Sequence, residues 1–368
     1  MFRNYQFKNI NYRLIIETLI LTIIGIMVIG SANSDFVNKQ IAGLIIGIIV
    51  MAFISLVDFE WILSLHWLSY SFAIVLLTAV LLFGDTSLGA KRWLKIGIRF
   101  QPSEICKIFL VIFFAWYLTN HQETLNSRNT VLKILALMIA PLVLILKEPD
   151  LSTTIVTFLV LVTMLYISGL SRKIALPVFL TVIILVAVYL LYVWQTESTP
   201  FLKSYQGVRI LSWMFPNDYP QNSYQQQNSL MAIGSGQMFG KGLNNNSLDS
   251  VKNGNYISEP QTDFIFAVAG EEMGFAGCLI IIALLFLITI ECYIAANKAN
   301  SLSGKLLCVG IGSIIGYQSF VNICVVTGLM PNTGLTLPFV SYGLTSLVTL
   351  FFGIGMVLNV GLQSRRKY

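Results

Sequence analysis

Charged residues are scarce in this 368-residue chain, since Asp, Glu, Lys and Arg together make up 11% of it and hydrophobic residues 56%. A soluble domain carries roughly 25% charged residues. The scarcity of charge excludes a soluble globular enzyme, a disordered regulator and a nucleic-acid-binding domain. No nucleic acid is therefore expected among the partners.

Cysteine and histidine are also few, and neither forms a recognisable site. His66 and His121 are isolated from one another, so they predict no metal site. The segment 236–242 has the glycines of a phosphate loop but is one residue short of the Walker spacing, and we reject it. Structural disulfides and a zinc site are not expected because the five cysteines lie in apolar stretches without a CxxC pair: Cys106, Cys278, Cys292, Cys308 and Cys324.

Long apolar runs are what the chain has in abundance. A membrane-spanning helix needs about 20 mostly apolar residues. We predict an all-α polytopic membrane protein, a single membrane domain over 1–368 with one large extracytoplasmic loop at about 195–262. The stretch 263–294 exceeds the bilayer thickness and is expected to tilt or protrude. The ten predicted spans are 13–31, 40–57, 67–83, 104–120, 131–147, 151–168, 174–194, 263–294, 304–328 and 337–361.

The basic residues predict the orientation of these spans. An even number of spans places both termini on one side, and both ends are basic, which indicates the cytoplasm. The loop 84–103 then faces outward although it is also basic, against the usual bias. This loop is either a face exposed to water or an anion site at the outer leaflet. Its cations are Lys91, Arg92, Lys95 and Arg99.

Ionisable residues at membrane depth are functional candidates. Glu104 and Lys107 are spaced i,i+3 on one helix face, after a helix start at Pro102. They form either an ion pair that fixes helix packing or part of a polar cavity that opens outward. Asp150, after a tight outward turn, is either a helix N-cap or a carboxylate at the cavity mouth. Asp263 is likewise either an N-cap or a catalytic group.

For two further segments the sequence predicts structural features. Glu271 and Glu272 are adjacent carboxylates deep in the eighth predicted span, and we favour a structural polar network for them. The segment 331–346 is dense in Gly, Pro and small polar residues. Such a segment at membrane depth indicates a re-entrant or cavity-lining stretch before the last span.

Six segments in order resemble the shape, elongation, division and sporulation (SEDS) family of RodA/FtsW/SpoVE type. Two departures stand out. Gly343-Leu344-Thr345-Ser346 replaces the commoner Gly-Gly-Ser-Ser, and Glu148-Pro149-Asp150 replaces Gln-Pro-Asp. The Leu344 departure blurs the distinction between elongation and division members. The matching segments are 89–93, 101–107, 148–153, 232–236, 262–272 and 331–346.

The resemblance implies ten spans, cytoplasmic termini and a peptidoglycan glycosyltransferase of the bacterial cytoplasmic membrane with its active site facing outside. Its substrate would be lipid II, polymerised into glycan strands for elongation, cell shape or division. Its partners would be a class B penicillin-binding protein and other elongasome or divisome membrane proteins. No cofactor is certain, and a divalent cation, Mg²⁺ or Mn²⁺, is left open because no ligand cluster predicts it.

Residue roles follow from the same resemblance. Asp263 would be the general base of an inverting transfer, with Lys107 and Glu104 as further catalytic residues. The alternatives are a lipid II flippase and a non-catalytic scaffold of the cell-wall complex. The outward position of Glu104, Lys107, Asp150 and Asp263 favours outer-face chemistry over transport. The residues expected to bind substrate are Lys91, Arg92, Trp93, Asp150 and Ser341.

Overall fold

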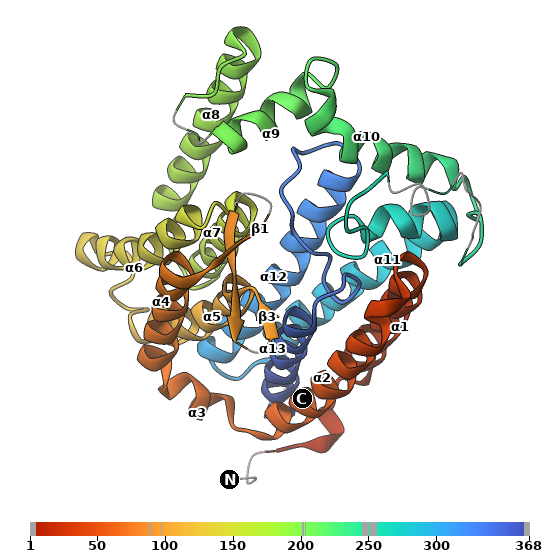
Figure 1. Ribbon diagram of the computed structural model, residues 1–368. Coiled ribbons are helices and arrows are strands. Elements are labelled where there is room, and N and C mark those ends of the chain that lie inside the picture. Colours follow the sequence, from red (N-terminus) through yellow and green to blue (C-terminus); the bar gives the residue numbers. More distant parts are fainter. Residues whose placement is uncertain are drawn as a thin grey trace.

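The computed structural model describes residues 5–87, 90–96, 98–200, 202, 204–244, 250 and 256–363. The chain is built of helices with one small sheet (Figure 1). The predicted all-α membrane fold is confirmed. The helices are α1 (Tyr12–Ala32), α2 (Val37–Leu56), α3 (Phe59–Ser64), α4 (His66–Phe83), α5 (Pro102–Asn120), α6 (Arg128–Lys147), α7 (Leu151–Ile167), α8 (Arg172–Thr196), α9 (Ser204–Met214), α10 (Pro220–Ser235), α11 (Ile265–Lys298), α12 (Leu302–Val326) and α13 (Leu344–Leu362).

Each of the ten predicted spans overlaps one of these helices. By length and composition, eight helices in the described part of the chain can cross a membrane. Helix α7 and the stretch Ile184–Thr196 of α8 are apolar but shorter. A total of ten spans therefore stays a prediction.

The two ends of the described chain lie together, an arrangement compatible with an even number of spans. The amide of Gln6 donates to the carbonyl of Leu362 at 2.8 Å. The side chain of Asn359 on α13 also donates to the hydroxyl of Tyr5 at 3.0 Å. Figure 1 shows both ends at the same end of the helix bundle.

The start of the last span differs from the prediction. Residues 337–343 were expected to be helical, but α13 begins at Leu344. The amides of Val340 and Ser341 instead donate to the carbonyl of Leu337 and close a turn. Apolar residues in this turn are buried by protein, and hydropathy does not distinguish a buried turn from a spanning helix.

Helix α12 lies at the centre of the bundle and packs against α5, α7, α11 and α13. Its residues are buried on most sides, whereas α2, α4 and α6 keep many large apolar side chains exposed. In a membrane protein such exposed apolar faces contact lipid. The centre of the bundle can therefore carry polar groups that the outer helices cannot.

Helix α11 is bent at Gly274, where φ is +67° and ψ is −165°. Its 34 residues would extend about 51 Å as a straight helix, well beyond the ~30 Å hydrocarbon core. Four main-chain hydrogen bonds join the bend to the turn 237–242: Lys241 N to Glu271 O, Gly242 N to Glu272 O, Phe275 N to Gln237 O and Ala276 N to Met238 O. We call this turn the clasp. Its backbone is engaged with the helix through these bonds.

The predicted network around Glu271 and Glu272 is confirmed at the same bend. Lys241 Nζ lies 2.8 Å from Glu271 Oε1. Ser31 on α1 donates to Glu272. The two carboxylates thus tie the clasp and α1 to α11.

The long loop predicted at about 195–262 contains helices α9 and α10, between α8 and α11. Ile210 and Leu211 of α9 are buried against Val193 of α8. Trp213 of α9 donates its indole N–H to Gly328 O at 2.8 Å, just after α12. The loop is therefore packed over the end of the bundle opposite the two chain ends, as Figure 1 shows.

Candidate functional site

The basic loop 84–103 folds as an antiparallel sheet of β1 (Asp85–Ser87), β2 (Ala90–Ile96) and β3 (Ile98–Phe100). Arg92 and Trp93 are neighbours on β2, so their side chains lie on opposite faces of the strand. Both are half-buried. The side chain of Lys91 lies outside the described part of the structure, so its role in binding substrate stays a prediction.

Arg92 reaches from β2 to the start of α7. One guanidinium nitrogen, Nη2, donates to the carbonyl of Pro149. Its Nε atom is buried and has no hydrogen-bond partner among the described residues. Arg92 is thus fixed in place yet keeps donor capacity.

Asp150 is the N-cap of α7. Its Oδ1 accepts from the amide of Thr153 at 3.1 Å, and its Oδ2 accepts from Gln101 Nε2 at 2.8 Å. The N-cap interpretation is confirmed. Because both oxygens are engaged and the residue is buried, Asp150 holds the cavity wall in shape.

Asp263 does not cap a helix. Helix α11 begins at Ile265 with Phe264 in the N-cap position and no side-chain cap hydrogen bond, so the N-cap interpretation of Asp263 is wrong. Its carboxylate lies instead against Gly334, in the loop before α13. A Cβ atom on Gly334 would lie 3.1 Å from Asp263 Oδ2 and 3.5 Å from Arg92 Nη1. The acid and the guanidinium therefore converge on the same small space.

Gly334 suits this position for two reasons. Its φ is +73°, a conformation that glycine adopts without strain. Its missing side chain also leaves the space between the two charged groups open. A side chain at position 334 would contact both the Asp263 carboxylate and the Arg92 guanidinium.

The pKa of Asp263 is raised from its ordinary value to about 6, and the largest cause is burial. Arg92 and Arg209 oppose this rise, while Glu259 and Asp150 add to it. A carboxylate with such a pKa is mostly ionised near pH 7 and can still accept a proton. These are the properties of a general base.

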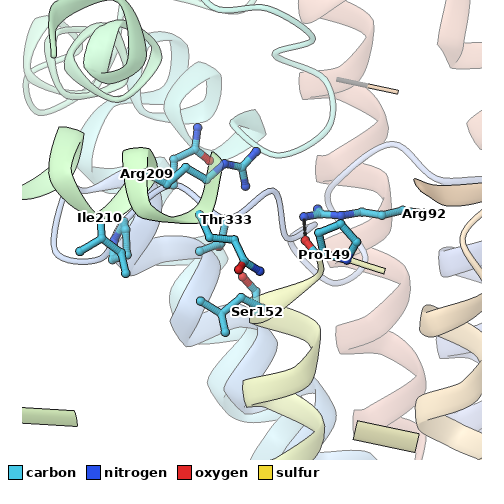
Figure 2. A pocket seen from close by; sticks show the side chains of 10 residues that line it. Arg92, Pro149, Ser152, Arg209, Ile210 and Thr333 are labelled. Carbon is cyan, nitrogen blue, oxygen red and sulfur yellow. Dashed lines mark hydrogen bonds between the residues drawn. The ribbon is translucent and has the colours of Figure 1, made fainter. Parts of the chain in front are cut away.

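A pocket that Arg92 lines lies between β2, the start of α7, α9 and the loop after α12 (Figure 2). Figure 2 shows Arg92 and Arg209 reaching toward the pocket from opposite sides. Ser152 Oγ and Thr333 Oγ1 are buried without a hydrogen-bond partner among the described residues. Two guanidinium groups and two hydroxyls suit a ligand rich in acceptor oxygens. The lining residues are Arg92, Pro149, Leu151, Ser152, Gln206, Arg209, Ile210, Pro331, Asn332 and Thr333.

Lys107 and Glu104 form the predicted pair, 2.8 Å apart and buried. Lys107 Nζ also donates to Gln318 Oε1, and Ser346 donates to Glu104 Oε2 at 3.2 Å. Helix α5 begins at Pro102, as predicted. The pair is engaged with its neighbours, so its geometry is that of the packing alternative.

Ser341 is similarly engaged within the protein. Its Oγ donates to the carbonyl of Thr262 at 2.7 Å and accepts from the amide of Leu337 at 2.7 Å. The residue is buried. It therefore fastens the loop before α13 to the residue that precedes Asp263.

Glu148 is buried close to Arg92 and Asp150. Both of its carboxyl oxygens are without a hydrogen-bond partner among the described residues. Burial, and secondarily Asp150, raise the pKa of Glu148 to about 9, while Arg92 lowers it. Glu148 is thus uncharged at neutral pH, like the glutamine it replaces in the family pattern.

No group of three or more His, Cys, Asp or Glu side chains that could hold a metal ion occurs among the described residues. The oxygens of Asp150 accept hydrogen bonds from Thr153 and Gln101. A divalent cation stays a prediction, and no step of the proposed reaction depends on one.

Arg209, Gln318 and Asn322 are functional candidates that the sequence analysis missed. Arg209 lies in the long loop, where distance along the chain hides its proximity to Arg92. Gln318 and Asn322 are amides one turn apart in an apolar segment, a signal of polar function at membrane depth. That signal was available in the sequence.

Comparisons with known proteins find relatives that match most of this chain. Residues 9–366 match the family model FTSW_RODA_SPOVE, described as "Cell cycle protein". Stage V sporulation protein E of Bacillus subtilis is 34% identical over 373 residues, which cover 96% of this chain and 97% of that protein. A "Probable peptidoglycan glycosyltransferase FtsW" of Buchnera aphidicola subsp. Schizaphis graminum is 38% identical over 301 residues, covering 80% and 81%.

Solved structures share the fold. A chain from a structure described as "Structural coordination of polymerization and crosslinking by a peptidoglycan synthase complex" matches with a TM-score of 0.78 and 25% identity, over 96% of this chain and 97% of that one. The rod shape determining protein RodA of Thermus thermophilus matches with a TM-score of 0.67 and 24% identity, over 97% and 98%.

Proposed function

The chain belongs to the FtsW, RodA and SpoVE family, and we propose that it polymerises lipid II on the outer face of the cytoplasmic membrane with Asp263 as the general base. Relatives of this chain are named peptidoglycan glycosyltransferases. One observation carries the assignment of the base. The Asp263 carboxylate and the Arg92 guanidinium converge on Gly334 beside a pocket with two arginines.

The proposed reaction is a displacement at C1 of the donor sugar. The 4-hydroxyl oxygen of the acceptor sugar bonds to C1, and its proton passes to the Asp263 carboxylate. The bond from C1 to the pyrophosphate oxygen breaks, and undecaprenyl pyrophosphate leaves with the electron pair. An α-linked donor gives a β-linked product, so the step inverts configuration.

The two arginines suit the leaving group. Arg92 and Arg209 present guanidinium groups to one pocket, and guanidinium matches phosphate oxygens in two-point hydrogen bonds. Ser152 and Thr333 add hydroxyl donors at the same place. Charge that develops on the pyrophosphate is stabilised by groups already in position.

Lys107, Glu104 and Ser341 have a different part in this proposal. Lys107 bonds to Gln318 on α12 and Glu104 accepts from Ser346 on α13, while Ser341 joins the loop before α13 to Thr262, the residue before the base. Asp150 keeps the start of α7 in shape beneath Arg92. These residues act through the position of others, whereas Asp263, Arg92 and Arg209 face the substrate.

A class B penicillin-binding protein is the partner we propose. The long loop offers it Leu230 and Met231 of α10, which are 41% and 62% exposed, whereas Ile210 and Leu211 of α9 are buried. A photocrosslinker at position 231 should capture the transpeptidase in membranes. Crosslinking at position 211 but not at 231 would contradict this surface.

The test of the activity uses purified protein in detergent with labelled lipid II. Wild type should form glycan polymer, and Asp263→Asn should lower the rate at least a hundredfold, the typical contribution of a general base. A flippase or a scaffold would form no polymer. Polymerisation by Asp263→Asn at the wild-type rate would remove Asp263 from the mechanism.

A further inference from the structure

Two amide side chains, Gln318 and Asn322, lie one turn apart on α12. Both are buried in the centre of the bundle, at 0% and 1% exposure. Residues four apart share one face of a helix, so both point to the same neighbours. Those neighbours are Asp263 and the loop before α13.

Asn322 bonds to the main chain on both sides of the site. Its Nδ2 donates to the carbonyl of Asp263 at 2.9 Å and to the carbonyl of Leu335 at 2.5 Å. A carbonyl oxygen only accepts, so these two bonds fix which end of the amide is the donor. The side-chain NH₂ group of Asn322 therefore links Asp263 to Leu335, the residue after Gly334.

Gln318 holds the next residue of the same loop. Its Nε2 donates to the carbonyl and to the hydroxyl of Thr336, at 3.0 Å and 3.1 Å. Its Oε1 accepts from Lys107. The buried ion pair thus orients Gln318, and Gln318 fixes the loop beside the Asn322 bond.

Three successive carbonyls before α11 are each bound from this side. Gln261 O accepts from the amide of Tyr342 at 2.9 Å, and Thr262 O accepts from the hydroxyl of Ser341 at 2.7 Å. Asp263 O accepts from Asn322. Of these three hydrogen bonds, the one from Asn322 is made to Asp263, the proposed base.

We infer that Asn322, oriented together with Gln318, is a positioning residue that fixes the Asp263 carboxylate opposite Arg92. The inference rests on the proposed role of Asp263 as general base. Neither amide lines the pocket, so neither is expected to contact the pyrophosphate. Because a misplacement of about 1 Å can cost about a hundredfold in rate, loss of these bonds should act on turnover and spare binding.

The test compares three variants in the detergent assay with lipid II. Asn322→Asp keeps the shape of the side chain but removes the NH₂ donor. Asn322→Leu removes all polarity at similar volume. Ser319→Ala is the matched control, because Ser319 is buried on the same helix but donates only to Ile315 O of its own turn, at 2.7 Å, among the described contacts.

We expect both Asn322 variants to lower kcat by about 10- to 100-fold with a KM for lipid II within about twofold of wild type. The acid limb of their pH profile should shift, since the carboxylate moves relative to Arg92. Ser319→Ala should keep kcat, KM and the pH profile. Asn322→Asp with wild-type kcat, or a loss confined to KM, would overturn the inference.

Folding and the assignment of the base are checked separately. Size-exclusion profiles and thermal unfolding identify variants that fail to fold. If Asn322→Asp fails, Gln318→Glu decides in the same way, since it loses the donor to Thr336 and keeps the oxygen that Lys107 binds. An inactive Asp263→Asn beside a fully active Asn322→Asp refutes the positioning role alone, whereas an active Asp263→Asn refutes the proposed base.

Discussion

Two pairs of opposite charges, Glu104 with Lys107 and Asp263 with Arg92, differ in what surrounds them. Glu104 and Lys107 are buried, touch each other at 2.8 Å and are completed by Gln318 and Ser346. Asp263 and Arg92 are half-buried and face a shared space at Gly334. The first pair is enclosed by protein partners and the second faces a space that Gly334 leaves open, so charge at membrane depth points to function only when partners are counted.

The largest expected effect comes from breaking the closed pair. Lys107→Met leaves Glu104 buried without its counter-ion, which costs about 3–5 kcal/mol of stability. Thermal unfolding in detergent should show a large drop or no folded protein. The double variant Glu104→Gln with Lys107→Met should recover most of that stability. A single variant as stable as wild type would show that this pair is not structural.

The next largest effect is expected from changing Arg92 in the Asp263 and Arg92 pair. Arg92→Lys keeps the charge but loses two-point recognition of phosphate, so kcat/KM for lipid II should fall about tenfold or more. The unfolding temperature should change little. Lys95→Gln is the matched control, since Lys95 lies on the opposite face of β2 and is exposed. Equal effects at positions 92 and 95 would contradict the pocket assignment.

A smaller effect is expected from pH. Burial raises the pKa of Asp263 to about 6, and a general base must be ionised. Activity should therefore be constant above pH 7 and fall about tenfold per unit below pH 6. Arg209→Gln removes a neighbour that lowers this pKa, so its acid limb should lie at higher pH. A wild-type profile that stays flat to pH 5 would exclude Asp263 as the titrating base.

The smallest effect at neutral pH is expected at Glu148. Its pKa in the folded protein is about 9, above the ordinary value of 4.5. The folded state holds this proton more tightly, so the contribution to stability is complete below pH 4.5 and declines as pH rises toward 9. Glu148→Gln should remove that decline, and melting curves at pH 6 and pH 9 measure it. An equal loss of stability between pH 6 and pH 9 in wild type and Glu148→Gln would show that Glu148 is already ionised at pH 6.

The parts of the fold that depend on local sequence were predicted well. Pro102 starts α5, Asp150 caps α7, and Glu104 pairs with Lys107 one turn later. Each depends on residues within four positions of one another. Caps, turns and i,i+3 pairs are determined by the chain's own geometry, so the sequence is sufficient for them.

The parts that depend on distant segments were not predicted. The convergence of Arg92 and Asp263 joins residues 171 positions apart, and Arg209 approaches them from a loop that hydropathy describes only as polar. Ser341 was expected to bind substrate, but its hydroxyl is bound to Thr262. Residue type alone does not tell whether a polar group meets another part of the chain or a ligand.

The clasp has a mechanical consequence. Four main-chain hydrogen bonds fasten it to the bend at Gly274, so the turn 237–242 is joined directly to the part of α11 before the bend. The part of α11 before the bend begins at Ile265, two residues after Asp263, so the main chain couples the clasp to the segment that carries the proposed base.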